Sequence, residues 1–193
     1  MRITREKKQE NHDRIVTIAS HMFRERGFDG VGVADLMEQA GLTHGGFYNH
    51  FASKDALIAE AAVQGFTQTS ERYAGYDVAQ VIDAYVSRQH RDARGEGCTA
   101  AALSGEAARL PDETRAVFGA GIEGLIGAVE SSLGASMPAS PEARARAISL
   151  LAQAVGAVVL SRACPDTSPL ADEILDTSRA TGHAALAGRG AGR

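Results

Sequence analysis

The sequence has little of what marks a secreted or membrane-spanning protein. Its two cysteines, Cys98 and Cys164, are too few for a disulfide framework. The N-terminus lacks the apolar stretch of a signal peptide. The longest apolar run, residues 150–160, is interrupted by Gln153 and is too short to cross a bilayer. We therefore expect a cytoplasmic protein that makes no use of a membrane.

Motifs for catalysis and metal binding are also missing. The chain has no G-x-S-x-G elbow and no clustered pair of carboxylates, and its histidines form no H-x-x-x-H pair. A G-x-G-x-x-G run at residues 119–124 resembles the dinucleotide fingerprint, but a helix start at 111–118 precedes it where that fingerprint needs a strand. We therefore expect no enzyme activity, no cofactor and no metal. These glycines are more typical of close helix packing, or of space left for a ligand.

Strand signals are absent as well. No proline precedes Pro111, and no stretch keeps a sustained alternation of β-branched residues. The apolar residues between Ile15 and Phe23 follow the spacing of one helix face, and Gly27 ends this helix. The sequence therefore predicts an all-α fold of about nine helices. After the first, they cover about 33–40, 44–50, 54–73, 77–93, 98–109, 111–134, 141–163 and 169–186.

Charge alone does not point to a nucleic acid, but it is compatible with one. The formal net charge is −4, whereas residues 1–54 contain eight Lys or Arg against seven Asp or Glu. Phosphate binding needs local positive charge rather than a basic chain, so an acidic remainder is tolerable. The basic side chains of the N-terminal arm cluster within eight residues: Arg2, Arg5, Lys7 and Lys8.

The segment from Gly27 to Leu57 has the pattern of a helix-turn-helix, in which a glycine joins two short helices and the second enters the major groove. Gly41 permits the turn. Thr43 is placed to cap the second helix and to offer its hydroxyl and nearby N–H groups to a phosphate. The residues spaced to pack the helices together are Leu36, Leu42, Phe47 and Phe51. The residues left facing outward are His44, Gly45, Gly46, Tyr48, Asn49 and His50.

Gly45 and Gly46 cost the second helix roughly 1 kcal/mol each in helix propensity. Close approach of the backbone to DNA would offset this cost, because neither position has a side chain in the way. The alternative interpretation is a surface helix hairpin that happens to carry Tyr and Lys. The joint occurrence of the glycine turn, the aromatic pair and the Ser53-Lys54 cap favours the helix-turn-helix.

The run Gly41–Leu57, GLTHGGFYNHFASKDAL, resembles the DNA-binding signature of the tetracycline-repressor (TetR) family, as do Gly27-Phe28 and Val33–Leu36 before it. The resemblance implies three DNA-binding helices, joined by a fourth to a helical domain that binds an effector and dimerises. It implies phosphate contacts from Thr43, Tyr48 and Lys54. It places the following residues at or near base edges: His44, Gly45, Gly46, Asn49 and His50.

Two residues depart from the family pattern. Gly32 stands where a Ser or Thr cap is common, and Ala34 stands where a basic residue is frequent. Because these changes remove phosphate contacts, we expect more of the affinity to come from Arg5, Lys7 and Lys8. The family layout then divides the chain into a helix-turn-helix domain (1–52), a connecting helix (53–76), an effector-binding and dimerisation domain (77–187) and a flexible tail (188–193).

Cys98 is a candidate sensor residue. It follows Gly97 at the start of a predicted helix, where the positive end of the helix dipole favours the thiolate. A Gly-Cys at this place also resembles a TetR subgroup in which some members respond to electrophiles or oxidants. The alternative is a small, buried residue at a helix start, lining a pocket. A disulfide bridge between Cys98 and Cys164 is a further alternative at this point.

The segment 147–163 is too apolar for a lone surface helix. Its apolar residues and those of the next helix form either a core or, as the resemblance implies, a four-helix interface between two copies. The candidates are Leu151, Val155, Val158, Val159, Ile174 and Leu175. A two-fold dimer would place two recognition helices about 34 Å apart on a palindromic site.

Together these features predict a homodimeric repressor of transcription. It would bind a palindromic operator in double-stranded DNA and be released by a small-molecule or reactive effector. The alternative from another class is a helical ligand carrier or enzyme whose N-terminal helix-turn-helix has no function.

Overall fold

The computed structural model describes residues 4–134 and 140–187. Two sequence predictions, the flexible tail at 188–193 and the basic residue Arg2, lie outside these residues. Within the described part of the chain every regular element is helical, with nine α-helices and two short 3-10 helices. The prediction of an all-α fold is therefore confirmed.

The first four elements lie close to their predicted positions. Thr4 begins α1, since its hydroxyl accepts a hydrogen bond from the Lys7 N–H at 3.2 Å, and Gly27 ends it. Ser53 begins α3 in the same way, with its hydroxyl 3.0 Å from the Ala56 nitrogen. The bounds are α1 (Arg5–Arg26), α2 (Val33–Gln39), the 3-10 helix η1 (His44–Asn49) and α3 (Lys54–Arg72).

The prediction of one helix over 77–93 is wrong, because the helix is interrupted at Val86. The Ser87 side chain bonds the backbone on both sides of this break. Its hydroxyl donates to the Ala84 carbonyl at 2.8 Å and accepts from the His90 N–H at 3.1 Å, which ends one helix and begins the next. The remaining elements are α4 (Val78–Tyr85), α5 (Arg88–Asp92), the 3-10 helix η2 (Arg94–Glu96), α6 (Thr99–Ala107), α7 (Asp112–Leu133), α8 (Pro141–Ala163) and α9 (Pro169–Ala187).

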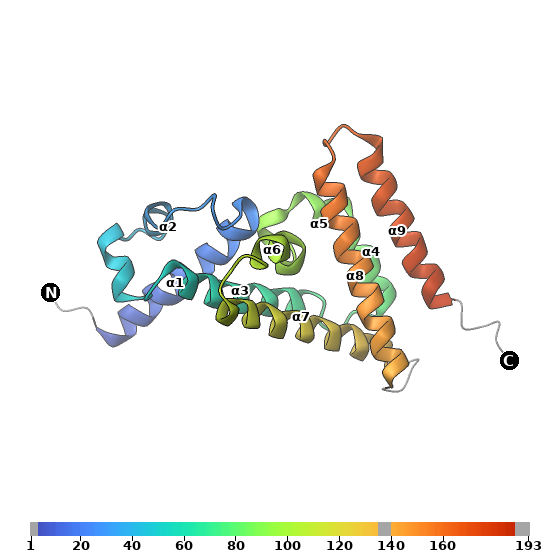
Figure 1. The fold of residues 1–193 in the computed structure, drawn as a ribbon, viewed down its shortest axis with the longest axis horizontal. Helices are drawn as coiled ribbons and strands as arrows, with labels where there is room; N and C mark the ends of the chain where they lie inside the picture. The colour runs from blue at the N-terminus through green and yellow to red at the C-terminus, as the bar shows by residue number, and fades with distance from the viewer. Residues whose placement is uncertain (1–3, 135–139, 188–193) are drawn as a thin grey trace.

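The molecule is elongated, with its two ends built from different parts of the chain (Figure 1). We call α1, α2 and η1 the head, and α4 to α9 the body. The long helix α3 packs against α1 in the head and against α7 in the body. The helices α8 and α9 pack side by side at the opposite end from α2. The fold thus places α2 far from the α8–α9 pair, whereas the end of α1 lies beside Val159 and Arg162 of α8.

Two of the six interface candidates belong to the core of the single chain. Val158 is 0% exposed and Leu175 is 2% exposed, and both pack in the main apolar cluster. Their assignment to a dimer interface is therefore wrong. On a helix, neighbours such as Val158 and Val159 point about 100° apart, so one faces the core while the other faces solvent. Val159 is 43% exposed, whereas Leu151, Val155 and Ile174 are half-buried against the same cluster.

Two of the described helices, α7 and α8, are long and apolar enough to cross a membrane by length and composition only. Neither helix is one long uninterrupted apolar run, because both mix small residues with apolar ones. Only 22% of the most apolar 18-residue stretch of α7, and 28% of that of α8, is buried within the protein. Of the two helices, α8 exposes large apolar side chains, namely Ile148, Val159 and Leu160.

Gly121 in α7 marks the closest approach of this helix to α3. A Cβ at this position would lie 2.2 Å from Cδ2 of Phe66. A Cβ at Gly119, two residues earlier, would meet no neighbouring atom within 4 Å. The G-x-G-x-x-G run is therefore part of a helix, and Gly121 serves helix packing as the sequence indicated.

We expect Gly121→Ala to destabilise the fold by about 1–3 kcal/mol, because the Phe66 ring must shift. Gly119→Ala is the matched control and should stabilise the fold by about 0.5–1 kcal/mol, because alanine favours the helix and meets no neighbour. Urea unfolding of both variants measures the difference. Equal effects of the two substitutions would contradict the packing described here.

Candidate nucleic-acid interface

The turn between α2 and η1 has the hydrogen bonds of a helix C-cap. The Leu42 N–H donates to the Met37 carbonyl at 2.8 Å, and the Gly41 N–H donates to the Glu38 carbonyl at 2.9 Å. Gly41 has a φ of +68°, a conformation that residues with a Cβ rarely adopt. The glycine expected at this turn is therefore required by the backbone.

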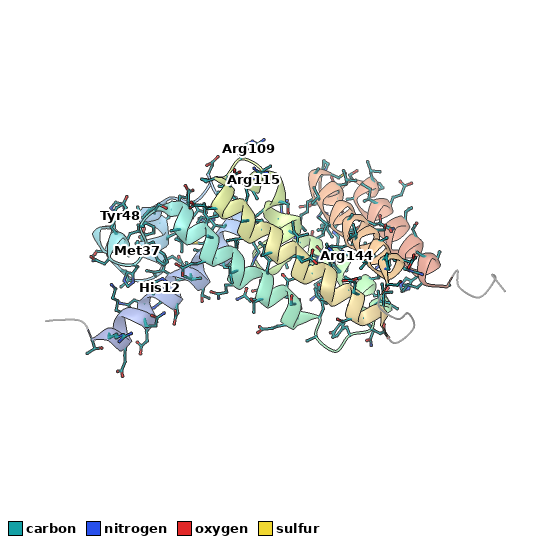
Figure 2. The ribbon with its side chains drawn as sticks, turned by 60° about the horizontal axis from the view of Figure 1, so that its bottom comes forward. His12, Met37, Tyr48, Arg109, Arg115 and Arg144 are labelled. Carbon is teal, nitrogen blue, oxygen red and sulfur yellow. The ribbon has the colours of Figure 1, made fainter. Side chains whose placement is uncertain are left out.

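The element η1 has one buried face and one exposed face. Phe47 and Leu36 of α2 are fully buried, and Phe51, just after η1, is 3% exposed. On the other face, Tyr48 is 70% exposed and points away from the protein at the head end (Figure 2). His44 and Asn49 are exposed as well. The buried face fixes η1 on α2 and leaves its polar side chains free to contact a ligand.

The recognition element is a 3-10 helix and not the α-helix expected. Its hydrogen bonds run over three residues, from the Gly46 N–H to the Thr43 carbonyl at 2.9 Å and from the His50 N–H to the Phe47 carbonyl at 2.8 Å. Adjacent glycines weaken the α-helix here, since each has low helix propensity. The capping bond expected from the Thr43 hydroxyl is not formed in the described structure, so this hydroxyl stays available.

A cleft of about 650 Å³ joins the start of α1 to η1. Its walls bring together residues that are about 40 positions apart, with Arg5 and Lys8 on one side and Thr43, Asn49 and His50 on the other. The basic arm and the recognition element, which the sequence analysis proposed separately, thus form one surface. Lys7 does not line this cleft, and its ammonium pairs with the Glu10 carboxylate at 2.9 Å.

The pKa of His50, which directly follows η1, is lowered from its ordinary value. Burial lowers the pKa of His50, and the positive potential of His12 and Lys8 lowers it further. The lowered pKa favours the neutral imidazole at pH 7.

Two residues that position this surface were missed by the sequence analysis. Arg14 of α1 donates to the Ala40 carbonyl at 3.2 Å and to the buried side chain of Asn11 at 2.7 Å. It thereby ties α1 to the end of α2. Because Arg14 and Ala40 are 26 positions apart, no local pattern marks their contact.

Lys54 is already engaged in the described structure. Its ammonium donates to the Phe28 carbonyl at 2.5 Å and lies 5.9 Å from the centre of the Phe23 ring. The phosphate contact that the resemblance implies for Lys54 stays a prediction. In the free protein this side chain instead holds the start of α3 on the segment after α1.

The thiol of Cys98 is buried, with 2% of the residue exposed. The Cys98 N–H donates to Nε2 of His90 at 2.9 Å, so His90 Nδ1 carries the proton that is donated to the Tyr85 carbonyl at 2.7 Å. Burial lowers the pKa of His90 to about 4, which keeps this imidazole neutral. Both cysteines are free thiols. Of the two roles considered for Cys98, burial favours the structural one, because a reagent must reach a thiol to modify it.

Comparisons with known proteins agree with this geometry. Residues 15–61 match the family model of bacterial regulatory proteins, tetR family. The matched range runs from the buried face of α1 through η1 into α3. The fold is similar to the crystal structure of E. coli NemR in its reduced form, with a TM-score of 0.72 and 21% identity over 90% of this chain and 95% of that one.

The head and the start of α3 therefore resemble the tetR family. Among curated relatives, it is 33% identical over 64 residues to an uncharacterized HTH-type transcriptional regulator, YvdT of Bacillus subtilis, covering 33% of each chain. It is 38% identical over 52 residues to the HTH-type transcriptional repressor KstR2 of Mycobacterium tuberculosis, covering 27% of this chain and 26% of the other. The chain thus spans about a third or less of the length of these relatives.

The cleft predicts which substitutions change affinity and which change sequence preference. We expect Lys8→Ala to weaken binding to every DNA sequence and to lower the slope of log affinity against log salt by about 1. Lys7→Ala is the matched control, and its effect should be smaller because Glu10 already pairs with this charge. Asn49→Ala should instead change which site is preferred. Titration of several DNA sequences at three salt concentrations measures both effects, and identical behaviour of all three variants would refute the assignment.

Proposed function

We propose that the protein is a DNA-binding regulator of transcription that acts as a dimeric repressor. The observation that carries this proposal is the exposed polar face of η1, held by a buried face and flanked by Arg5 and Lys8 in one cleft. An element of this kind fits the major groove, while the basic arm neutralises phosphates. The relative KstR2 is a transcriptional repressor, which supports the same proposal.

Selection of binding sites from random double-stranded DNA tests this proposal. We expect the full chain to enrich a palindromic sequence, with affinity that falls steeply as salt rises. Tyr48→Ala should reduce this affinity without changing the melting temperature, since Tyr48 is exposed. Absence of any specific, salt-dependent binding would sink the proposal and leave a helical ligand carrier as the better description.

We also propose that α8 and α9 form the interface between two copies. Four large apolar side chains on these helices are exposed although they are not needed for the core of one chain. They are Ile148 at 43%, Val159 at 43%, Leu160 at 60% and Leu170 at 51%. The low burial of α8 within one chain has the same explanation, because a second copy would cover this face.

Leu160→Asp should convert the dimer to a monomer in sedimentation velocity and weaken DNA binding, because a single head reads only half of a palindrome. Val63→Asp is the matched control. Val63 is 54% exposed on α3, away from α8, and this substitution should leave the dimer intact. A dimer that survives Leu160→Asp would place the interface elsewhere.

An effector would act on DNA binding through α3 and the segment after α1. By the rise of an α-helix, the 19 residues of α3 span about 28 Å from the Lys54 end to the body. At the head end, the Phe28 N–H donates to the Glu106 carboxylate of α6 at 2.7 Å. A ligand that favours one placement of α3 and α6 therefore shifts the spacing of two heads in a dimer, which lowers operator affinity.

A further inference from the structure

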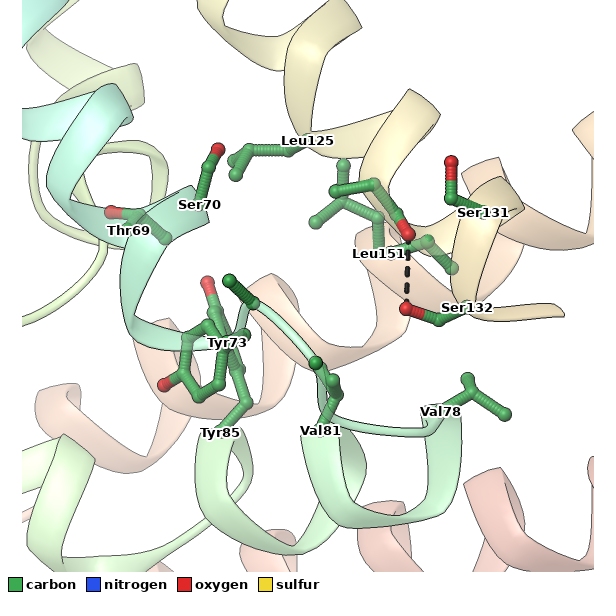
Figure 3. A pocket seen from close by; sticks show the side chains of 14 residues that line it. Thr69, Ser70, Tyr73, Val78, Val81, Tyr85, Leu125, Ser131, Ser132 and Leu151 are labelled. Atoms are coloured by element: carbon green, nitrogen blue, oxygen red, sulfur yellow. Dashed lines mark hydrogen bonds between the residues drawn. The ribbon is translucent and has the colours of Figure 1, made fainter.

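The body contains an apolar cavity of about 310 Å³ at the far end of α3. It is lined by the end of α3, by α4, by α7 and by Leu151 of α8. Tyr73 and Tyr85 lie together at one end of the cavity, and Ser131 and Ser132 lie at the other (Figure 3). Apolar side chains such as Val81 and Leu125 line the space between them.

None of the described residues that line this cavity carries a charge. A charged ligand would lose its hydration on entry without gaining an ion pair, and this cost is large in an apolar site. The lining therefore selects against anions and cations. It favours a ligand that is uncharged and mostly apolar.

Three of the six hydroxyl groups in the cavity wall already donate hydrogen bonds to the backbone. Thr69 donates to the Gly65 carbonyl at 2.8 Å, Ser131 to the Gly127 carbonyl at 2.9 Å, and Ser132 to the Ala128 carbonyl at 3.0 Å. In contrast, the Tyr85 hydroxyl is buried and makes no full-strength hydrogen bond in the described part of the chain, where its contact is with the Cys98 thiol, a weak partner. A buried polar group without a strong partner is costly, so a ligand that completes its bonding gains affinity.

The Tyr85 ring is held firmly in place. It meets the His90 ring edge-on at 4.4 Å between ring centres and lies 5.9 Å from the Tyr73 ring. Burial raises the pKa of Tyr85 well above its ordinary value, and nearby Cys98 adds to this rise. Burial also raises the pKa of Tyr73 to about 12. Both phenols therefore stay protonated at pH 7 and offer O–H donors.

The volume of the cavity sets the size of the ligand. An apolar protein cavity of about 150 Å³ accepts one benzene molecule, so a cavity of this size accepts about two such rings. We infer that the effector of this protein is an uncharged molecule of about two fused rings, with a hydroxyl or carbonyl oxygen that accepts a hydrogen bond from Tyr85. This inference rests on the proposed function, because it names the class of effector that the repressor would sense.

Isothermal titration calorimetry of the full chain with 2-naphthol tests this inference. 2-Naphthol has two fused rings, one hydroxyl and no charge at pH 7. The comparison probe is 2-naphthoate, which has the same rings and carries a carboxylate. We expect 2-naphthol to saturate one site per chain and 2-naphthoate to bind at least tenfold more weakly.

Tyr85→Phe should weaken 2-naphthol binding about three- to tenfold, because it removes one hydrogen bond and keeps the ring. Tyr76→Phe is the matched control and should leave the affinity unchanged, since Tyr76 does not line the cavity. Ala128→Phe, on the exposed side of the α7 wall, should block the cavity and abolish binding. It provides a second test if Tyr85→Phe alters the fold.

Three results would overturn the inference. They are no binding of 2-naphthol, equal binding of 2-naphthoate, or unchanged binding in Ala128→Phe. The titration contains no DNA, so its failure leaves the DNA-binding proposal standing. Conversely, a chain that binds 2-naphthol with this selectivity but binds no DNA would retain the cavity assignment and lose the repressor assignment.

Discussion

The structure depends on the way one residue, Phe28, is held between the head and the body. Its N–H donates to Glu106 of α6, and its carbonyl accepts from Lys54 of α3. Its ring packs edge-on against Phe23 of α1 at 5.4 Å and against Phe118 of α7 at 6.2 Å between ring centres. Four helices therefore meet at a single residue that follows the end of α1. Because both backbone groups and the ring are engaged, the head cannot turn on the body without breaking several of these contacts at once.

A second contact strengthens this joint from the other side of α1. The buried Arg24 side chain donates to the Gly95 carbonyl at 2.7 Å, and the Glu25 carboxylate accepts from the Gly95 N–H at 2.8 Å. A Cβ at Gly95 would lie 2.5 Å from Nε2 of His21, so a larger residue here would displace the His21 ring. The proposed effector cavity lies at the far end of α3 from Lys54. Under the proposed mechanism, one continuous helix and these two sets of contacts would link occupancy of that cavity to the orientation of the head.

Local patterns in the sequence predicted most of the head. Periodic apolar residues marked α1, Gly41 marked the turn, and Ser53 marked the start of α3, because each depends on residues only a few positions apart. The sequence did not predict the 3-10 geometry of η1 or the interruption at Val86, because both depend on individual hydrogen bonds within one turn. The domain boundaries stay predictions. So do the DNA-contact residues, even though the cleft brings several of them together.

Long-range contacts explain the rest of what the sequence could not predict. Glu106 and Phe28 are 78 positions apart, and Arg24 and Gly95 are 71 apart. Neither pair carries a motif. Val158 and Leu175 looked like interface residues because apolar periodicity identifies a buried face without stating what buries it. The cavity was equally invisible, since its walls come from four helices and its distinctive feature is one hydroxyl without a strong partner.

The exchange rate of the Phe28 amide hydrogen tests the central claim most directly. If the joint holds head and body as one unit, this amide should open only with the global unfolding that exposes core amides such as Leu57 and Val158. Its protection should then match theirs, and Glu106→Ala should abolish it while leaving the core amides protected. Rapid exchange at Phe28 in the unmodified chain, at the rate of an exposed loop, would contradict the account.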